Sequence, residues 1–423
     1  MKKIVLLISF SIFYLIPDKT WSKTGLVTQK AMVVSAREEA SKIGVEIMKK
    51  GGNAFDAMVA TELALAVAYP YAGNIGGGGF MVFRKAKGET GTLDFREKAP
   101  LAAKKDMYLD KNGNVIPNLS VDGALAIGVP GTIAGVFAVH EKLGKLSMAE
   151  IMKPIIALAK KGLEITKKEA KTLQNYHAIL VKVNGEKTLL AQNYKAGDTL
   201  KYPALAETLM RILKNGKDEF YKGETAKKMV DFVQKKGGII SLKDLANYEV
   251  KWREPVIFHY KDLKIISMSP PSSGGMTLEQ IMKMIEPYPI SKFGHNSVKT
   301  IQVVTEAERR AYADRNYFLG DPDFIKIPRN ELLDKNYLKQ RMQSFDWNKA
   351  TPSSEVSHGV ISASESNETT HFSIVDADGN AVSVTTTLNG AYGSKLYSDE
   401  LGFFSTTKWM ILVPNLELQI PMV

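Results

Sequence analysis

The apolar positions of this chain alternate between the spacing of strands and the spacing of helices. Residues 31–35 are predicted to form a strand, and residues 38–50 an amphipathic helix. Gly51 and Gly52 follow that helix, where glycine can adopt the left-handed conformation that ends many helices. Residues 54–68 predict a second, apolar helix. The alternation indicates a protein that combines helices with strands, and no repeat of solenoid length is present.

Later segments continue the same pattern. The middle of the chain, residues 147–236, is predicted to be mostly helical, and a long helix is expected at residues 298–314. Further strands are expected at residues 80–83, 91–95, 256–258 and 263–267.

A β-hairpin is predicted near the end of the chain. Residues 369–376 and 381–388 alternate apolar and polar positions, and an Asp-Gly turn signal stands between them. Antiparallel partners around this turn have position numbers that sum to about 756 or 757. Thr369 is therefore expected to lie opposite Thr387 or Leu388.

The hairpin would gather Thr369, Thr387 and the nearby Asn389 at one end. A threonine hydroxyl is a weak nucleophile without an adjacent base, and a cut before the residue would free an α-amine to serve as that base. The polar, aperiodic residues 350–368 are typical of a mobile, cuttable linker. Threonines are also ordinary strand residues, so the hairpin alone leaves both interpretations open.

The composition is that of an ordinary globular protein, with 44% hydrophobic and 24% charged residues among 423. The 56 Lys and Arg against 45 Asp and Glu give a net charge of +11. Acidic residues are interspersed with the basic ones, and no run of five basic residues occurs. Nucleic acid is therefore not an expected partner.

The N-terminus has the pattern of a secretory signal peptide, predicted to span residues 1–22. Two lysines form the charged start, an apolar stretch at residues 4–16 follows, and Thr20 and Ser22 supply small residues for cleavage. An N-terminal membrane anchor is the alternative. A periplasmic or secreted protein is expected, and because the chain has no cysteine it has no disulfides.

Several stretches match a known family in the same order along the chain. Across nearly its whole length after the signal peptide, the sequence resembles the γ-glutamyltranspeptidases, members of the N-terminal nucleophile hydrolase group. The matching stretches are GGNAFDA at 51–57, GNIGGGGF at 73–80, LDFREKAP at 93–100, GVPGT at 128–132, PPSSGG at 270–275 and AYADR at 311–315, together with the Thr369 hairpin.

The resemblance implies an α+β fold of the N-terminal nucleophile hydrolase type, a four-layer αββα sandwich. It implies self-cleavage between Glu368 and Thr369, with residues 23–368 as the large-subunit region and residues 369–404 as the start of the small-subunit region. Thr369 would carry a γ-glutamyl ester and pass the acyl group from a glutathione-like substrate to water, an amino acid or a peptide. Thr387 would orient its hydroxyl, and no cofactor or metal is expected.

By the same resemblance Arg96 would grip the α-carboxylate of the γ-glutamyl group, and Asn389 would hold the same end of the substrate. A guanidinium suits this role because it is planar and can bond a carboxylate bidentately. The alternative for Arg96 is a surface ion pair with Asp94 or Glu97.

Two other features are given structural interpretations. His371 lies close to Thr369 in sequence, but the family does not use it as a base, so it is interpreted as a strand residue. The glycine run at residues 76–79 could imitate a phosphate loop. It lacks the Lys-Ser/Thr ending of such loops, so tight backbone packing is expected instead.

The resemblance ends after Phe404. There the family continues with an asparagine and acidic motif that holds the substrate's α-amine, then a serine pair and a glycine pair that complete the oxyanion hole, and further core elements. Residues 408–411 can be encoded by AAA-TGG-ATG-ATT. If a G precedes these codons and the frame starts one base earlier, they are translated as Glu-Met-Asp-Asp, which contains the acidic motif of the family. We hypothesise a frameshift, with residues 405–423 an out-of-frame tail that does not pack natively and a fold incomplete at the C-terminus.

Three functions therefore remain open at the level of sequence. The chain is an active γ-glutamyltransferase and glutathione hydrolase, an inactive remnant of that family, or a related acylase of β-lactam side chains.

Overall fold

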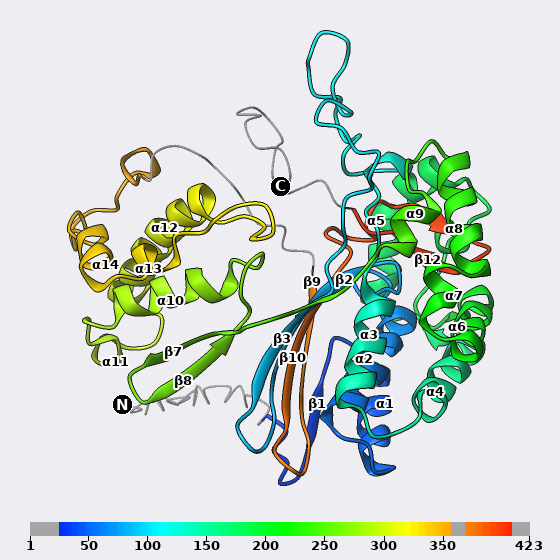
Figure 1. Ribbon diagram of the computed structural model, residues 1–423, viewed down its shortest axis with the longest axis horizontal. Helices are drawn as coiled ribbons and strands as arrows, with labels where there is room; N and C mark the ends of the chain where they lie inside the picture. Colours follow the sequence, from blue (N-terminus) through cyan, green and yellow to red (C-terminus); the bar gives the residue numbers. More distant parts are fainter. Residues whose placement is uncertain (1–24, 358–368, 408–423) are drawn as a thin grey trace, which may run out of the picture.

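The computed structural model describes residues 25–357 and 369–407 (Figure 1). The predicted signal peptide, most of the predicted linker including Glu368, and residues 408–423 lie outside the described residues. Within the described start of the linker, Ser353–Glu355 forms a short 3-10 turn, η3.

A six-stranded antiparallel sheet in the order β1-β9-β10-β2-β3-β6 forms the centre of the molecule. The two strands of the C-terminal hairpin lie between strands from the N-terminal region, so the hairpin is an interior part of the sheet. The six strands are β1 (Met32–Val34), β2 (Gly78–Arg84), β3 (Thr90–Asp94), β6 (Lys251–Arg253), β9 (Thr369–Val375) and β10 (Ala381–Thr387).

The hairpin of β9 and β10 confirms the predicted pairing. Thr369 lies opposite Thr387, the first of the two partners that the turn allowed. Gly379 forms the turn at a φ of 89°, a value that favours glycine, and its amide donates to the carbonyl oxygen of Asp376 at 3.1 Å. The strand register predicted from the position of the turn is therefore correct.

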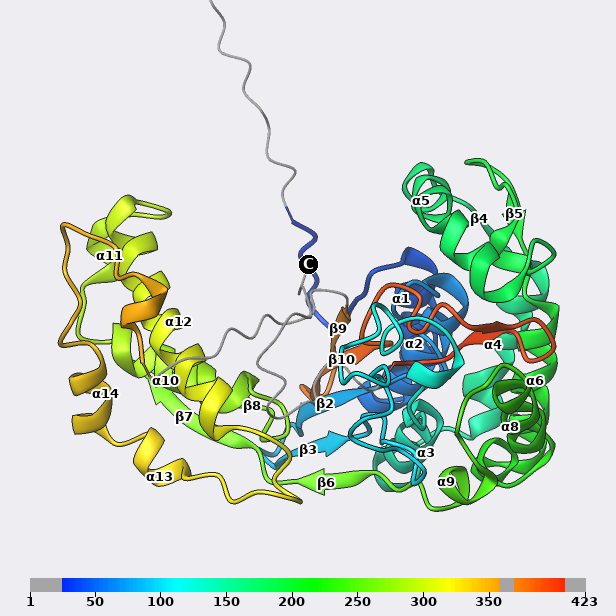
Figure 2. The same cartoon turned by 90° about the horizontal axis from the view of Figure 1, so that it is seen from above.

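Helices α1, α2 and α3 cover one face of the sheet, and α4 packs against α1 and α2 (Figures 1 and 2). Alternate residues of β9 are buried toward these helices, as a sheet with one covered face requires. The bounds are α1 (Glu38–Lys49), α2 (Ala54–Ala68), α3 (Thr132–Leu143) and α4 (Met148–Lys161). The predictions for residues 38–50 and 54–68 are confirmed.

The hairpin turn is tied to the start of α2. Asn53 caps this helix by accepting from the amides of Phe55 and Asp56 at 2.9 and 3.0 Å. The carboxylate of Asp376, beside the turn, accepts from the amide of Ala54 at 2.9 Å. One end of α2 is therefore held by the same hairpin whose other end carries Thr369.

Further helices and two small ribbons complete the larger part of the molecule. The helices are α5 (Lys167–Asn184), α6 (Pro203–Asn215), α7 (Lys217–Tyr221), α8 (Glu224–Lys235) and α9 (Leu242–Ala246), with 3-10 turns η1 (Ala124–Ala126) and η2 (Leu189–Ala191). The ribbons pair β4 (Leu163–Glu164) with β5 (Thr199–Leu200), and β11 (Tyr397–Ser398) with β12 (Phe403–Phe404).

A second, smaller part lies beyond β6 and has its own apolar clusters (Figure 2). Arg253 on β6 joins the two parts, because its guanidinium contacts Asp94 at 3.0 Å and Asp323 at 3.2 Å. The predicted helix at 298–314 is confirmed and extends to Phe318. The elements are β7 (Val256–Tyr260), β8 (Leu263–Ser267), α10 (Gly274–Ile285), α11 (Ile290–Phe293), α12 (Val298–Phe318), α13 (Arg329–Leu332) and α14 (Lys335–Arg341).

The glycine run packs tightly, as expected. A Cβ added at Gly76 would lie 2.1 Å from the carbonyl oxygen of Phe404, and one at Gly77 would lie 2.6 Å from that of Thr387. Such contacts are far inside van der Waals separation, so only glycine lets the backbones approach this closely. The run brings β2 against β10 and the segment around β12.

The prediction that residues from 405 onward do not pack was wrong for Ser405–Thr407. Ser405 is 7% exposed, and Thr406 and Thr407 are fully buried. The amide of Thr406 donates to the carbonyl oxygen of Gly76 at 2.9 Å, and that of Thr407 to Leu388 at 3.2 Å. These bonds use the backbone, so they tolerate any side chain that fits. Residues 408–423 lie outside the described residues.

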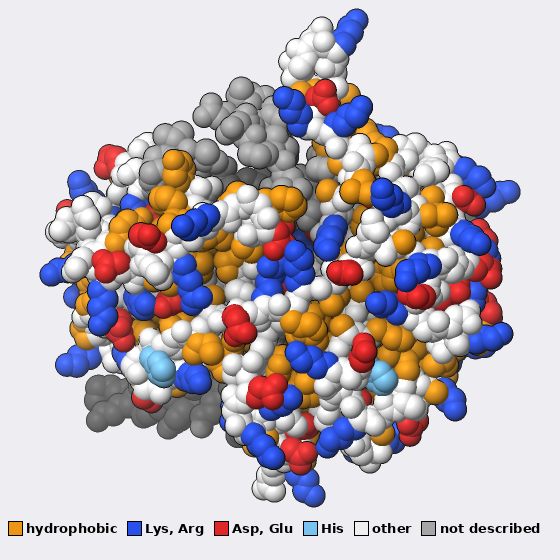
Figure 3. Space-filling view, in the orientation of Figure 1, with side chains coloured by type: hydrophobic (Ala, Val, Ile, Leu, Met, Phe, Trp, Pro, Cys, Tyr) orange, Lys and Arg blue, Asp and Glu red, His pale blue; other side chains and the backbone are white. Residues whose placement is uncertain are grey.

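The surface shows no single-sign region on the face of Figure 3, where Lys and Arg side chains are interspersed with Asp and Glu. Within the described ranges, no helix combines the length and the apolar character that a membrane span needs.

Candidate active site

The residues singled out by sequence gather at one end of the central sheet. Thr369 begins β9, Thr387 ends β10, and Gly78 begins β2 directly opposite Thr387. Arg96 follows shortly after the end of β3, and Asn389 shortly after the end of β10. Antiparallel pairing places all these positions at the same end of the sheet, although Arg96 and Asn389 are 293 positions apart along the chain.

Thr369 and Thr387 form a directly opposed pair on the face of the sheet that α2 does not cover. Side chains in such pairs share a face and have Cβ atoms about 4.5–5.5 Å apart. Thr369 is exposed and Thr387 is 2% exposed. The Thr387 hydroxyl accepts from the amide of Asn389 at 2.8 Å, a bond that orients it without using its own proton.

Arg96 lies in a network of side-chain hydrogen bonds with Glu97 and Asn389. Its Nε donates to Glu97 Oε2 at 2.9 Å and its Nη2 to Glu97 Oε1 at 3.1 Å. Nη2 also donates to Asn389 Oδ1, and Asn389 Nδ2 donates to Glu97 Oε1 at 2.9 Å. The structure thus brings the two predicted substrate-binding residues into direct contact.

The ion pair between Arg96 and Glu97 is not a surface pair. The Glu97 side chain is fully buried and that of Arg96 is 19% exposed. Burial acts to lower the pKa of Arg96, but the charges of Glu97 and Asp94 outweigh it and raise the pKa above its ordinary value. These bonds use Nε and Nη2 of Arg96, so the site holds a positive charge whose position is fixed by Glu97 and Asn389.

Asn389 stands in a strained loop. Its φ is 70°, in the left-handed region that asparagine adopts more readily than most residues. Tyr392 and Lys395 also have positive φ, at 57° and 61°. Asn389 Nδ2 contacts the carbonyl oxygen of Thr407, so the described end of the chain helps to hold this loop in place.

His371 lies on the same face as Thr369 but is engaged elsewhere. Its Nδ1 lies 2.9 Å from Thr385 Oγ1, and its Nε2 lies 3.0 Å from Ser383 Oγ and 3.2 Å from Ser373 Oγ. Partial burial lowers the pKa of His371, so the ring is neutral at pH 7. Its interpretation as a strand residue within β9 is confirmed.

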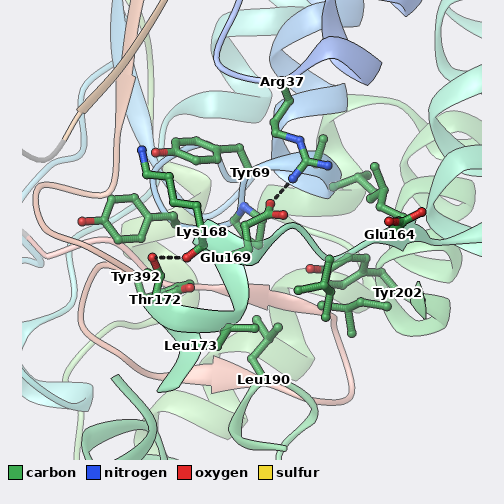
Figure 4. A pocket seen from close by; sticks show the side chains of 17 residues that line it. Arg37, Tyr69, Glu164, Lys168, Glu169, Thr172, Leu173, Leu190, Tyr202 and Tyr392 are labelled. Atoms are coloured by element: carbon green, nitrogen blue, oxygen red, sulfur yellow. Dashed lines mark hydrogen bonds and ion pairs between the residues drawn. The ribbon is translucent and has the colours of Figure 1, made fainter. Parts of the chain in front are cut away.

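A cavity of about 140 Å³ lies away from these residues, beside helix α5 (Figure 4). Two of its charged lining residues, Arg37 and Glu169, face each other and form an ion pair. None of the candidate residues Thr369, Thr387, Arg96 and Asn389 lines it, so it is separate from the candidate site. Apolar and aromatic side chains dominate the rest of its wall: Val67, Tyr69, Tyr71, Leu163, Ile165, Leu173, Leu190, Leu200, Tyr202 and Tyr392.

No group of three or more His, Cys, Asp or Glu side chains that could hold a metal ion is present in the described ranges. The arrangement has a threonine pair and the cation of Arg96 at the same end of the sheet, which suits chemistry by a hydroxyl nucleophile on an anionic substrate.

Comparison with known proteins identifies relatives that share this arrangement of segments. The family model described as gamma-glutamyltranspeptidase matches residues 40–409. The glutathione hydrolase proenzyme of Escherichia coli K12 is 43% identical over 378 residues, which cover 88% of this chain and 65% of that protein. The chain spans about two thirds of the length of the curated relatives it matches.

Solved structures agree with the family match. The crystal structure of Helicobacter pylori gamma-glutamyltranspeptidase superposes with a TM-score of 0.76 at 44% identity, covering 79% of this chain and 97% of that one. A cephalosporin acylase from Bacillus halodurans superposes with a TM-score of 0.79 at 21% identity, covering 95% and 75%. The second likeness concerns the fold alone, and together they confirm the expected α+β fold of the N-terminal nucleophile hydrolases.

Proposed function

This chain belongs to the γ-glutamyltranspeptidase family, and on that premise we propose that it is a precursor that cuts itself before Thr369 and then transfers γ-glutamyl groups. The observation that carries the proposal is the meeting of Thr369, Thr387, Arg96 and Asn389 at one edge of the sheet. A hydroxyl nucleophile and a carboxylate clamp are the two parts that such a reaction needs.

Self-cleavage would begin with the hydroxyl of Thr369. Its oxygen attacks the carbonyl carbon of Glu368, the bond from that carbon to the Thr369 nitrogen breaks, and the nitrogen takes up the hydroxyl proton. The resulting ester is opened by water, which leaves a carboxylate on Glu368 and restores the Thr369 hydroxyl. Thr369 then begins a new chain with a free α-amine.

That α-amine would serve as the general base for transfer. It accepts the proton of the Thr369 hydroxyl while the oxygen attacks the γ-carbonyl carbon of the substrate, and the departing amine takes the proton. A γ-glutamyl ester on Thr369 remains. Water, an amino acid or a peptide then attacks the ester and releases the hydroxyl, with Thr387 orienting that hydroxyl throughout.

Arg96 and Asn389 would hold the α-carboxylate of the γ-glutamyl group. The bonds from Arg96 to Glu97 use Nε and Nη2 and fix the guanidinium plane, and Nη1 would donate to the carboxylate. Glutathione is the proposed natural substrate because its γ-glutamyl residue carries this free carboxylate. The relatives' names as glutathione hydrolases support the assignment over a β-lactam side-chain acylase.

Intact mass spectrometry of the purified chain tests the proposal. We expect two polypeptides, the second beginning at Thr369, because Thr369 lies opposite Thr387 at the end of the sheet where Arg96 and Asn389 meet. We also propose that the chain is exported, so the first polypeptide from the periplasm or medium should begin at Lys23. A single uncut chain that turns over no γ-glutamyl anilide would instead favour an inactive remnant of the family.

Replacing His371 by alanine is expected to change the rates of cleavage and turnover by less than about tenfold. Its ring bonds to hydroxyls on β9 and β10 rather than to Thr369, whereas loss of a true general base costs about 10²–10⁴-fold. Gel-based cleavage time courses and anilide turnover give the two rates. A loss of 10²-fold or more would make His371, and not the α-amine, the base.

A further inference from the structure

Glu62 is an acid in the middle of an otherwise apolar, fully buried helix. All residues of α2 are buried, and Glu62 itself is 0% exposed. Its Oε1 lies 2.6 Å from Thr386 Oγ1, while its Oε2 has no hydrogen-bond partner within the described residues. A buried carboxyl group with one bonded oxygen is costly unless it is neutral.

The neutral form fits the contacts of Glu62. Burial raises its pKa to about 7, and the hydrogen bond with Thr386 only partly opposes this. Thr386 Oγ1 also lies 3.4 Å from the carbonyl oxygen of Gly78. A protonated Glu62 can donate to the Thr386 hydroxyl, which leaves the hydroxyl proton for the Gly78 carbonyl.

The contacts from Glu62 through Thr386 to Gly78 end next to the candidate active site. Thr386 precedes Thr387, and Gly78 is the strand partner of Thr387. A Cβ at Gly78 would lie 3.0 Å from the Cα of Arg96, so the backbone of Arg96 rests against Gly78. Glu62 therefore connects β10 and β2 at the position along the strands where Thr387 and Arg96 lie close together.

We propose that Glu62 is a positioning residue that holds Thr386 and Gly78 and thereby sets the placement of Thr387 and Arg96. The inference rests on the proposed function for its catalytic consequence. Glu62 acts through the backbone of β10 and β2 and does not touch the substrate. Loss of its hydrogen bond is expected to loosen the edge of the sheet that carries the site.

Two measurements on one set of variants test this role. The set is Glu62→Leu, Thr386→Val, their double variant and Glu62→Gln, which keeps a neutral hydrogen-bonding group. Thr61→Val is the matched control, because the Thr61 hydroxyl is also buried in α2 but has no hydrogen-bond partner in the described part of the chain. Hydrogen exchange is followed in peptides covering β10, and kcat and KM are measured with a γ-glutamyl anilide.

Glu62→Leu and Thr386→Val are each expected to speed exchange in β10 by about tenfold. They are expected to lower kcat/KM by about 10–10²-fold, the effect of misplaced catalytic and substrate-binding groups. The double variant should be no worse than either single one, since both remove the same contact. Glu62→Gln and Thr61→Val should stay within about threefold of the parent in both measurements.

The inference is overturned if Glu62→Leu exchanges like Thr61→Val, if Glu62→Gln is as damaging as Glu62→Leu, or if the two single effects add. A parent chain that turns over no substrate would remove the proposed function. The exchange comparison would then decide by itself whether Glu62 holds this edge of the sheet.

Discussion

Replacing Thr369 by alanine is expected to leave the chain uncut and to lower γ-glutamyl turnover by about 10³-fold or more. The hydroxyl is the proposed attacking group in both reactions, and we expect neither Thr387 nor Thr370 to replace it. Thr387 is held by the amide of Asn389, and Thr370 points to the buried side of the sheet. Mass spectrometry gives the extent of cleavage, and anilide turnover gives the rate.

Ser373→Ala is the matched control for this variant. Ser373 lies on the same strand and the same face as Thr369, and its hydroxyl lies 3.2 Å from His371 Nε2. Removing it deletes a hydroxyl of β9 without touching the site, so cleavage and turnover should stay within about threefold of the parent. Thr369→Ser keeps a hydroxyl and should retain cleavage. Full cleavage of Thr369→Ala would contradict the assignment of the nucleophile.

The hairpin and its register could be predicted because their determinants are local. An Asp-Gly turn between two alternating segments fixes which residues face each other, and the pairing of Thr369 with Thr387 followed from counting. The same holds for α1 and α2, whose glycines and caps stand next to their apolar runs. Local signals of this kind do not depend on how distant segments pack, so they can be interpreted from the sequence alone.

The network around Arg96 could not be predicted in the same way. Asp94 lies two positions before Arg96 and Glu97 one position after it, so either could pair with it, and only the path of the backbone after β3 selects Glu97. Asn389 joins the network from a distant part of the chain, through a loop with a left-handed residue. Glu62 was visible as an acid among apolar residues, but its partner Thr386 depends on how α2 sits on the sheet.

The packing of Ser405–Thr407 shows where reasoning from side chains fails. A departure from a family's sequence indicates lost side-chain contacts, yet the bonds that hold these residues are made by backbone amides. Backbone amides and carbonyls can form the same hydrogen bonds whatever side chain they carry, provided that the side chain fits.

Replacing Arg96 by lysine is expected to lower kcat/KM for a γ-glutamyl anilide by about 10²-fold. A hydrogen bond to a charged group contributes about 1.5–3 kcal/mol, and each 1.4 kcal/mol is about tenfold. Lysine keeps the charge, so the buried Glu97 is not left unpaired, but it cannot offer two parallel donors. Steady-state kinetics of the cleaved enzyme measure the loss.

A substrate that lacks the α-carboxylate makes the test specific to the proposed clamp. The parent should lose about 10²-fold on this analogue, whereas Arg96→Lys should lose only a few-fold, because its clamp is already impaired. Arg253→Lys is the matched control: Arg253 pairs with Asp94 and Asp323, away from the threonines, and its variant should discriminate as the parent does. If Arg96→Lys slows both substrates equally, Arg96 supports the site through Glu97 and does not bind the carboxylate.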